Sequence, residues 1–328
     1  MPLRHYSKRV KYGVFIGTLR IGMLRIGRLQ QARTPRRSRQ MVNARPTVER
    51  RQLGLTLKRC RERAGLSQLD AGQHIGVDDS RISKVEDGFA TLAADKLERL
   101  IDFYQVTGDE RETILALGTE ARKRAPRQSY TDVLPGSFQR FTDLEADAAK
   151  IHSYESGIVP GLLQSPGYIN AVFEAAESVW WQPSETVRQQ RTAFRLQRQH
   201  NTWQSQKPKQ LHFVIGEAAV TEIAGSPAVM VEQLDHLLSI MASRMNATIQ
   251  LLPFSVPNNP ARGGGLTVLE FGLAVPRVGF ASVVHGPSTY YDESERTAAM
   301  LRTFQRLTQL ALSPEETRRA ITRKKEEF

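Results

Sequence analysis

The segment between Ser67 and Gly88 constrains the fold of this chain more sharply than any other. It reads SQLDAGQHIGVDDSRISKVEDG, the pattern of two short helices joined by a turn at Gly76. Ser67 is a good N-cap, and a glycine after Ile75 allows the left-handed backbone that ends a helix. Asp78 is placed to cap the second helix. This pattern predicts two crossed helices, of which the second is able to enter a DNA major groove.

The second helix of this pair has an apolar face and a polar face. Ile82 and Val85 lie three residues apart, so both point inward against the neighbouring helix. The polar side chains on the outer faces are Ser80, Arg81, Ser83 and Lys84. Gly88 ends the helix. An open alternative is a helical bundle whose outer face contacts another protein.

This segment, with its ISKVEDG ending, resembles the Xre/Cro-repressor family of helix-turn-helix proteins over about residues 48 to 105. The resemblance implies contacts with double-stranded DNA at six positions. Gln68 matches the position that hydrogen-bonds a phosphate, and Arg81 and Ser83 are expected near the DNA backbone. The positions expected to face base edges are Asp79, Ser80 and Lys84.

Flanking segments extend the motif to a five-helix domain. Leu53, Leu57 and Cys60 recur every three or four residues, as on a buried helix stripe. Four basic residues take the other faces of that helix, where phosphate contact and a solvated face are both open interpretations: Lys58, Arg59, Arg61 and Arg63. A further helix with Leu97 and Ile101 on its core side follows.

The formal net charge of +12 is concentrated at the start of the chain. Lys and Arg total 46, and 11 of them lie in residues 1–40, which contain no Asp or Glu; this leaves 35 basic against 34 acidic residues. Residues 1–44 are therefore predicted to be a disordered basic extension, either an arm that adds non-specific DNA affinity or a mis-assigned start ahead of Met41.

The predicted domain layout follows from these changes in composition. After the extension come a helix-turn-helix domain at 45–125, a linker at 126–135, a C-terminal regulatory or partner-binding domain at 136–316, and a charged tail at 317–328. A single cysteine is compatible with a reducing cytoplasm, and no apolar run is long enough to span a bilayer. We therefore expect a cytoplasmic, nucleoid-associated protein with no membrane partner.

The C-terminal domain is predicted to be a mixed α/β domain with a small sheet, so that the whole chain is α+β. A helical stripe starting at Phe138 and Phe141 is expected to continue through Ile151 towards Tyr154. Strand-like runs follow at 211–215, 248–252, 266–271 and 278–284, with helices at about 227–244 and 293–312.

This half resembles the large C-terminal domain of actinobacterial regulators of development and secondary metabolism, a domain without a settled biochemical activity. The segments that carry the resemblance are 145–151, 158–168 with its PGLLQ motif, 233–238 and 251–254. The resemblance implies a regulator that binds a very small protein encoded beside it. An antitoxin-like interaction protein, with DNA binding serving autoregulation, is the alternative function.

No arrangement of side chains in this half predicts catalysis, so we expect no enzyme activity, no catalytic residue, no cofactor and no metal. His152 and Glu155 are three residues apart, expected on one helix, but no second pair of ligands supports a metal site. The glycine run at 263–265 lacks the GK[ST] of a phosphate-binding loop and is expected to be a flexible hairpin connection. An enzyme attached to a DNA-binding domain ranks last.

The sequence therefore predicts a transcription regulator whose C-terminal domain senses a small partner protein or ligand. A homodimer is expected on an inverted repeat, with half-sites about 10 bp apart or a multiple of that distance.

Overall fold

The computed structural model describes residues 46–123, 130–131, 136–180, 184–207, 209–272, 275–281 and 289–328, without the side chains of 176–180. The basic extension at 1–44 lies outside the described residues, as does the predicted linker apart from residues 130 and 131. Residues 43–328 form one compact unit.

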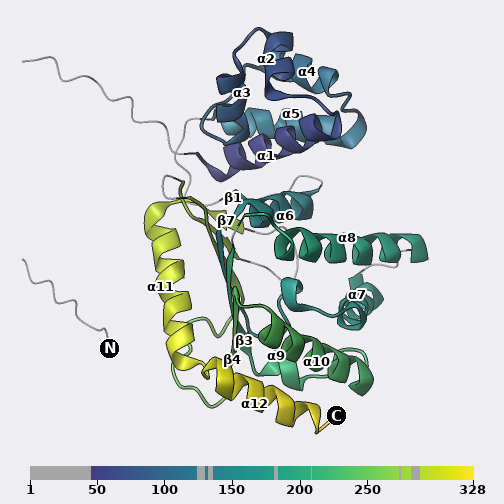
Figure 1. The fold of residues 1–328 in the computed structure, drawn as a ribbon, viewed down its shortest axis with the longest axis vertical. Coiled ribbons are helices and arrows are strands. Elements are labelled where there is room, and N and C mark those ends of the chain that lie inside the picture. The colour runs from purple at the N-terminus through teal and green to yellow at the C-terminus, as the bar shows by residue number, and fades with distance from the viewer. Residues whose placement is uncertain are drawn as a thin grey trace, which may run out of the picture. The chain divides into compact units, whose positions relative to one another are not determined.

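Five helices make up the N-terminal part of the described chain (Figure 1): α1 (Val48–Arg63), α2 (Gln68–Ile75), α3 (Asp79–Glu86), α4 (Ala94–Phe103) and α5 (Gly108–Arg122). Thr47 and Ser67 cap α1 and α2 through their hydroxyl oxygens, as short polar residues do at helix starts. The helices enclose one apolar core, in which Leu57, Ile82 and Leu117 are almost completely buried. The five-helix prediction is confirmed.

A seven-stranded mixed sheet forms the centre of the C-terminal part, with the order β1-β7-β6-β5-β2-β3-β4. Its strands are β1 (Tyr130–Thr131), β2 (Lys150–Glu155), β3 (Gln210–Gly216), β4 (Ala247–Leu252), β5 (Leu266–Glu270), β6 (Val278–Ala281) and β7 (Thr289–Tyr291). β2, β3 and β4 run parallel, and the remaining pairs are antiparallel. The predicted α+β class is confirmed, and the sheet is larger than the four predicted strands.

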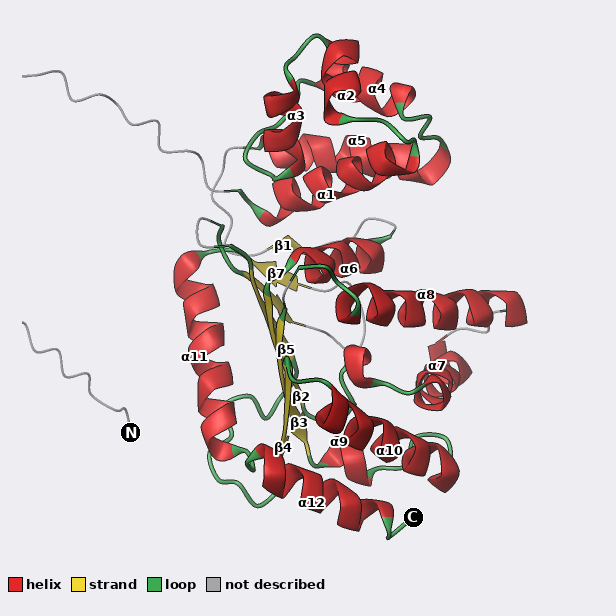
Figure 2. Cartoon of the chain, in the orientation of Figure 1, coloured by secondary structure: helices red, strands yellow, loops and turns green. Residues whose placement is uncertain are grey.

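Helices cover both faces of this sheet (Figure 2). Those on one face include the crossover connections that parallel strands require. Between β2 and β3 lie a 3₁₀ turn, η1 (Gly161–Leu163), and the helices α7 (Pro166–Trp180) and α8 (Glu185–Trp203). Between β3 and β4 lie α9 (Ala218–Thr221) and α10 (Pro227–Ser243), and α6 (Ser137–Asp147) precedes β2. Figure 2 shows α11 (Ser294–Leu310) on the face opposite α8 and α10.

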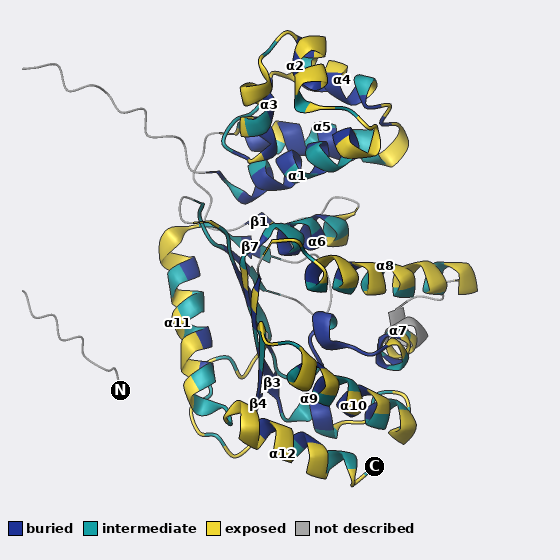
Figure 3. Cartoon of the chain, in the orientation of Figure 1, coloured by how far each residue is buried: buried dark blue, intermediate teal, exposed yellow. Residues whose placement is uncertain are grey.

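The apolar core lies on both sides of the sheet. On the α8 and α10 side, Ile151, Phe213 and Leu237 belong to the largest cluster of buried apolar residues. On the α11 side, Tyr154 and Phe304 belong to a smaller one. Figure 3 shows the buried residues gathered on the strands, with exposed residues on the outer faces of the helices.

The predicted helix from Phe138 towards Tyr154 is wrong in its second half. α6 ends at Asp147, and Ile151 and Tyr154 belong to β2, where successive side chains alternate between the two faces of the sheet. His152 and Glu155 therefore point to opposite faces and do not form the i, i+3 pair of a helix. Because both faces of β2 are covered, its apolar residues give no clean alternation in the sequence.

Three further sequence interpretations need correction. The strand β1 lies in the predicted linker, and its Tyr130 pairs with Tyr290 of β7. The predicted tail at 317–328 contains most of α12 (Pro314–Lys325), whose Ile321 is completely buried in the main core. The glycine run at 263–265 does not join a hairpin, because β4 and β5 are not neighbours in the sheet.

Candidate nucleic-acid interface

Local interactions fix α2, the turn and α3. Ser67 accepts a hydrogen bond from the backbone N–H of Asp70, and the Asp70 carboxylate accepts one from the backbone of Ser67, a complete capping box. Gly76 ends α2 with a left-handed φ of 66°. Asp78 then caps α3 by accepting a hydrogen bond from the Arg81 backbone N–H at 2.6 Å. Every one of these signals lies in the sequence itself, and the structure confirms the predicted caps.

The three residues expected to face base edges are all exposed. Asp79 and Ser80 lie in the first turn of α3, and Lys84 lies one turn further along. Ile82 and Val85 on the opposite face are almost fully buried, as predicted. The outer face of α3 is thus exposed to solvent.

Hydrogen bonds already restrict the polar groups of the first turn. The Ser80 hydroxyl donates to the Asp78 carboxylate at 2.8 Å, and the Ser80 backbone N–H donates to Asp79 at 2.8 Å. Bonds from Ser80 and from the Arg81 backbone hold the pKa of Asp78 below its usual value. Asp78 is therefore an ionised cap, and Ser80 retains its oxygen as an acceptor.

Gln68 is oriented by a buried ion pair that the sequence analysis did not identify. Glu86, at the end of α3, accepts hydrogen bonds from the Arg61 guanidinium at 2.6 and 2.9 Å. The Gln68 amide donates to the same carboxylate at 2.8 Å. Glu86 thereby ties α1, α2 and α3 together and fixes the direction of the Gln68 side chain. The only signal in the sequence is the acid that follows Val85 on the inner side of α3.

The two other residues predicted to contact the DNA backbone, Arg81 and Ser83, lie in α3. The Arg81 guanidinium donates to the carbonyl oxygen of Thr91 at 2.7 Å, which holds this exposed side chain along the loop after α3. The Ser83 hydroxyl donates weakly to Asp87 at 3.4 Å. The structure therefore brings all six predicted residues to α3 and the first turn of α2.

The arginines of α1 have another role than the phosphate contacts considered above. Arg61 is buried against Glu86, and Arg63 pairs with Glu110 of α5 at 2.6 Å. Arg59 pairs with Asp143 of α6. These charges are therefore used in ion pairs within the protein, and the phosphate interpretation is wrong for Arg61, whose side chain is only 9% exposed.

Comparison with known protein families identifies two regions of the chain. Residues 52–114 match the model of a helix-turn-helix domain, and residues 138–323 match that of a domain of unknown function, DUF5753. The second match covers more than half of the chain. The chain belongs to the DUF5753 family. Searches of curated proteins and of solved structures give no match.

The helix-turn-helix match supports a DNA-binding role for α1 to α5. As in an Xre-like regulator with a large C-terminal domain, the DUF5753 domain follows these helices in the sequence. Among the described residues, no helix is both long enough and apolar enough to cross a membrane. Within the same residues, no group of three or more His, Cys, Asp and Glu side chains is arranged to hold a metal ion.

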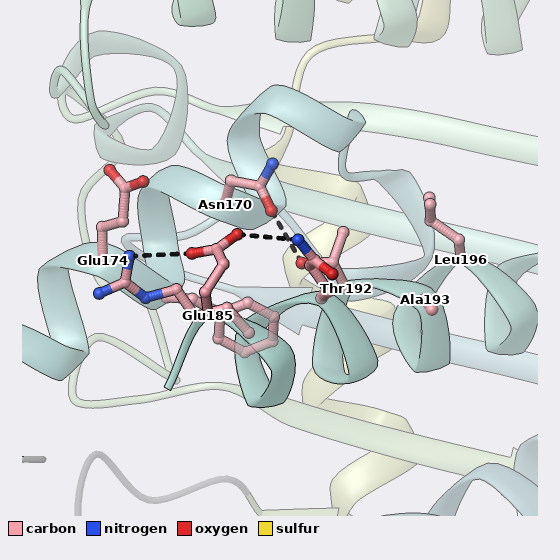
Figure 4. Close-up of a pocket in the computed structure, with 9 residues that line it drawn as sticks. Asn170, Glu174, Glu185, Thr192, Ala193 and Leu196 are labelled. Carbon is pink, nitrogen blue, oxygen red and sulfur yellow. Dashed lines mark hydrogen bonds and ion pairs between the residues drawn. The ribbon is translucent and has the colours of Figure 1, made fainter. Parts of the chain in front are cut away.

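Among the described residues, three hollows lie along α8 of the DUF5753 domain. One is a cleft of about 360 Å³ between α7 and α8 (Figure 4). Asn170 and Thr192 face each other across it and are joined by a 2.8 Å hydrogen bond, and Gln189 is bonded to Glu185. A second, of about 580 Å³, is lined by residues of α6, α7 and α8 and also has Arg195 in its wall. The third, called here the larger cavity, has a volume of about 880 Å³ and lies between α6, α8 and the sheet.

Proposed function

We propose that this chain is a sequence-specific DNA-binding transcription regulator that acts as a homodimer in the nucleoid. The observation that carries the proposal is the two-sided character of α3. Its inner face is held by Ile82, Val85 and the Glu86–Arg61 ion pair, while its outer face presents Asp79, Ser80 and Lys84 to solvent. A rigid helix with an uncommitted polar face is what major-groove recognition requires.

The hydrogen bonds that each side chain already makes indicate which DNA atoms it would contact. The Ser80 hydrogen is engaged by Asp78, so the Ser80 oxygen would accept from an exocyclic amino group of adenine or cytosine. Lys84 would donate to guanine O6 or N7, and Asp79 would accept from a cytosine amino group. An amide nitrogen carries two hydrogens, and Gln68 uses one on Glu86, so the other would meet a phosphate.

Contacts between α1 and the DUF5753 domain support a sensing role for the latter. The Arg51 guanidinium bonds Asp147 of α6 at 2.5 Å, and its carbon lies 3.7 Å from the Phe271 ring centroid. The Val48 backbone N–H donates to Asp292 at 2.8 Å. A partner protein or ligand that changed these contacts would change the position of α1, on which α3 packs. We therefore propose that the DUF5753 domain transmits a signal to the DNA-binding helices.

The first experiment is chromatin immunoprecipitation with sequencing, followed by titration of the recovered operator and of base-substituted variants. Lys84→Ala is expected to lower discrimination at one or two base pairs by about 1–3 kcal/mol each. Gln68→Ala is expected to weaken all sequences alike, because phosphate contacts carry no sequence information. Lys324→Ala, on α12, is the matched control and should leave the affinity unchanged.

Two results would contradict the proposal. If Lys84→Ala weakened every sequence equally, Lys84 would not read bases. If the purified chain ignored duplex DNA even at low ionic strength, where phosphate contacts are strongest, the regulator assignment itself would fail.

A further inference from the structure

The larger cavity of the DUF5753 domain has the size and the position of a small-molecule site. Its volume of about 880 Å³ lies within the usual range for ligand pockets, roughly 300–1,000 Å³. It opens at the carboxyl end of β2, where Glu155 is the last strand residue and residues 156–162 line the wall. Ligands commonly bind beyond the carboxyl ends of parallel strands.

One side of this cavity is apolar and aromatic. Phe141 of α6 stacks on Phe280 of β6 with ring centroids 4.2 Å apart, and Phe213 of β3 is completely buried beside Ile151. The hydroxyls of Ser153 and Thr267, on paired positions of β2 and β5, lie 3.2 Å apart in the same wall. An occupant would therefore meet rigid aromatic surface with a few polar groups.

The opposite side carries two arginines of α8 whose charges are balanced unequally. Arg198 binds both carboxylate oxygens of Glu145, at 2.5 and 2.8 Å, so this pair neutralises itself. Within the part of the chain that the structure describes, Arg195, one turn earlier, donates only to the neutral amide oxygen of Gln164, at 2.6 Å. Among the described residues, its buried Nε has no hydrogen-bond acceptor.

The charge on Arg195 is correspondingly unfavourable. Burial, followed by the positive charges of Arg198 and Arg191, lowers the pKa of Arg195 to about 10. Its guanidinium carbon lies 4.6 Å from the Phe173 ring centroid, which stabilises the flat face of the cation but supplies no acceptor to its edge. An anion is the group that would satisfy both the charge and the N–H.

The cavity also contains one further acid, at a different part of its wall. Glu155 lies against Gly265, where a side chain larger than hydrogen would collide with the carboxylate. Glu155 is not among the charges that shift the pKa of Arg195, which are those of Arg198 and Arg191.

We propose that this cavity is the effector site of the regulator and binds a small organic acid. Its carboxylate or phosphate pairs with Arg195, and its apolar body lies along Phe141 and Phe280. The effector role rests on the proposed function, whereas the binding of the acid does not.

α6 is the element through which an occupied cavity acts on the DNA-binding helices. Phe138, Phe141 and Glu145 of α6 line the cavity, while Asp143 and Asp147 of the same helix pair with Arg59 and Arg51 of α1. A ligand that shifts α6 therefore changes the ion pairs that hold α1.

Binding is tested on the full chain without DNA, by saturation-transfer NMR with matched aromatic acids and amides. The probes are naphthalene-1-carboxylate, its neutral carboxamide, and phenyl phosphate, which separates carboxylate from phosphate preference. The acids are expected to bind about tenfold or more tightly than the amide, as for a charged hydrogen bond. Arg195→Met should abolish this preference while leaving the amide affinity unchanged, and Arg195→Lys should retain part of it.

Arg188→Met, on the same helix but outside the cavity, is the control and should keep the preference. The proposal is overturned if acids and amide bind alike, if no probe binds at millimolar concentration, or if Arg195→Met keeps the preference. Because no DNA is present, these outcomes are independent of operator binding. Operator titration with and without the tightest acid then tests the effector role, and an unchanged affinity would reject it.

Discussion

Replacing Gly54 by alanine tests whether close helix packing or helix propensity governs the stability of the DNA-binding helices. Gly54 lies inside α1, where a glycine costs about 1 kcal/mol relative to alanine, so propensity alone predicts a gain of that size. In the structure, a Cβ at Gly54 would lie closer than 3.0 Å to the carbonyl oxygens of Val85 and Glu86 at the end of α3.

The steric cost should exceed the propensity gain. Overpacking a well-packed core costs typically about 1–3 kcal/mol, and here the obstructing atoms are backbone oxygens that cannot rotate away. We expect the upper end of that range, and so a net loss of about 2 kcal/mol for Gly54→Ala. Because α3 must move away from α1, operator affinity should fall as well.

Urea unfolding of the full chain measures the effect as a lower midpoint with an unchanged slope. Gly118→Ala in α5 is the matched control, because the Cβ there meets a terminal methyl group of the Leu97 side chain, which can rotate, and not a backbone oxygen. We expect its net effect to stay within about 1 kcal/mol. Stabilisation of Gly54→Ala by about 1 kcal/mol would refute the packing argument, since propensity would then have decided the result.

Three further predictions concern buried charges and the single thiol. Glu86→Ala should cost about 3 kcal/mol in urea unfolding, because it leaves a buried guanidinium without its partner; a loss below about 0.5 kcal/mol would contradict this. Burial chiefly raises the pKa of Cys60 to about 11, so iodoacetamide at mildly alkaline pH should alkylate only the unfolded chain, as mass spectrometry would show. Burial favours a high pKa for Glu270, but bonds from Arg277 and His152 outweigh it and lower the pKa. The ionised Glu270 carboxylate therefore stabilises the folded chain at pH values above the usual glutamate pKa, and this contribution is lost as the pH falls through the lowered pKa of the folded state. In Glu270→Gln, the free energy of unfolding should depend less on pH in this acidic range.

The candidate DNA-binding site was predictable from sequence because its signals are local. The caps at Ser67 and Asp78, the left-handed turn at Gly76 and the inward pair Ile82 and Val85 all lie within one short segment. Each depends on residues three or four positions away, which a sequence displays directly.

Neighbours distant in sequence account for what the sequence did not reveal. The strand β2 was taken for helix because its hydrogen-bonded neighbours β3 and β5 lie more than fifty residues away in the chain, and the groups that cover its two faces are also distant in sequence. Cross-strand and interhelical partners of this kind leave no periodic pattern in the segment itself.

The sequence by itself determined that a capped, glycine-turned helix pair with a polar outer face exists near residues 67–88, since short-range hydrogen bonding and helix geometry suffice for that. Only the tertiary structure decided where the buried charges go. It paired Arg61 with Glu86 and Arg198 with Glu145, and it left Arg195 beside an aromatic cavity with an unmatched charge. The free energy of a buried charge depends on which groups the fold brings within hydrogen-bonding distance, and chain order does not contain those distances.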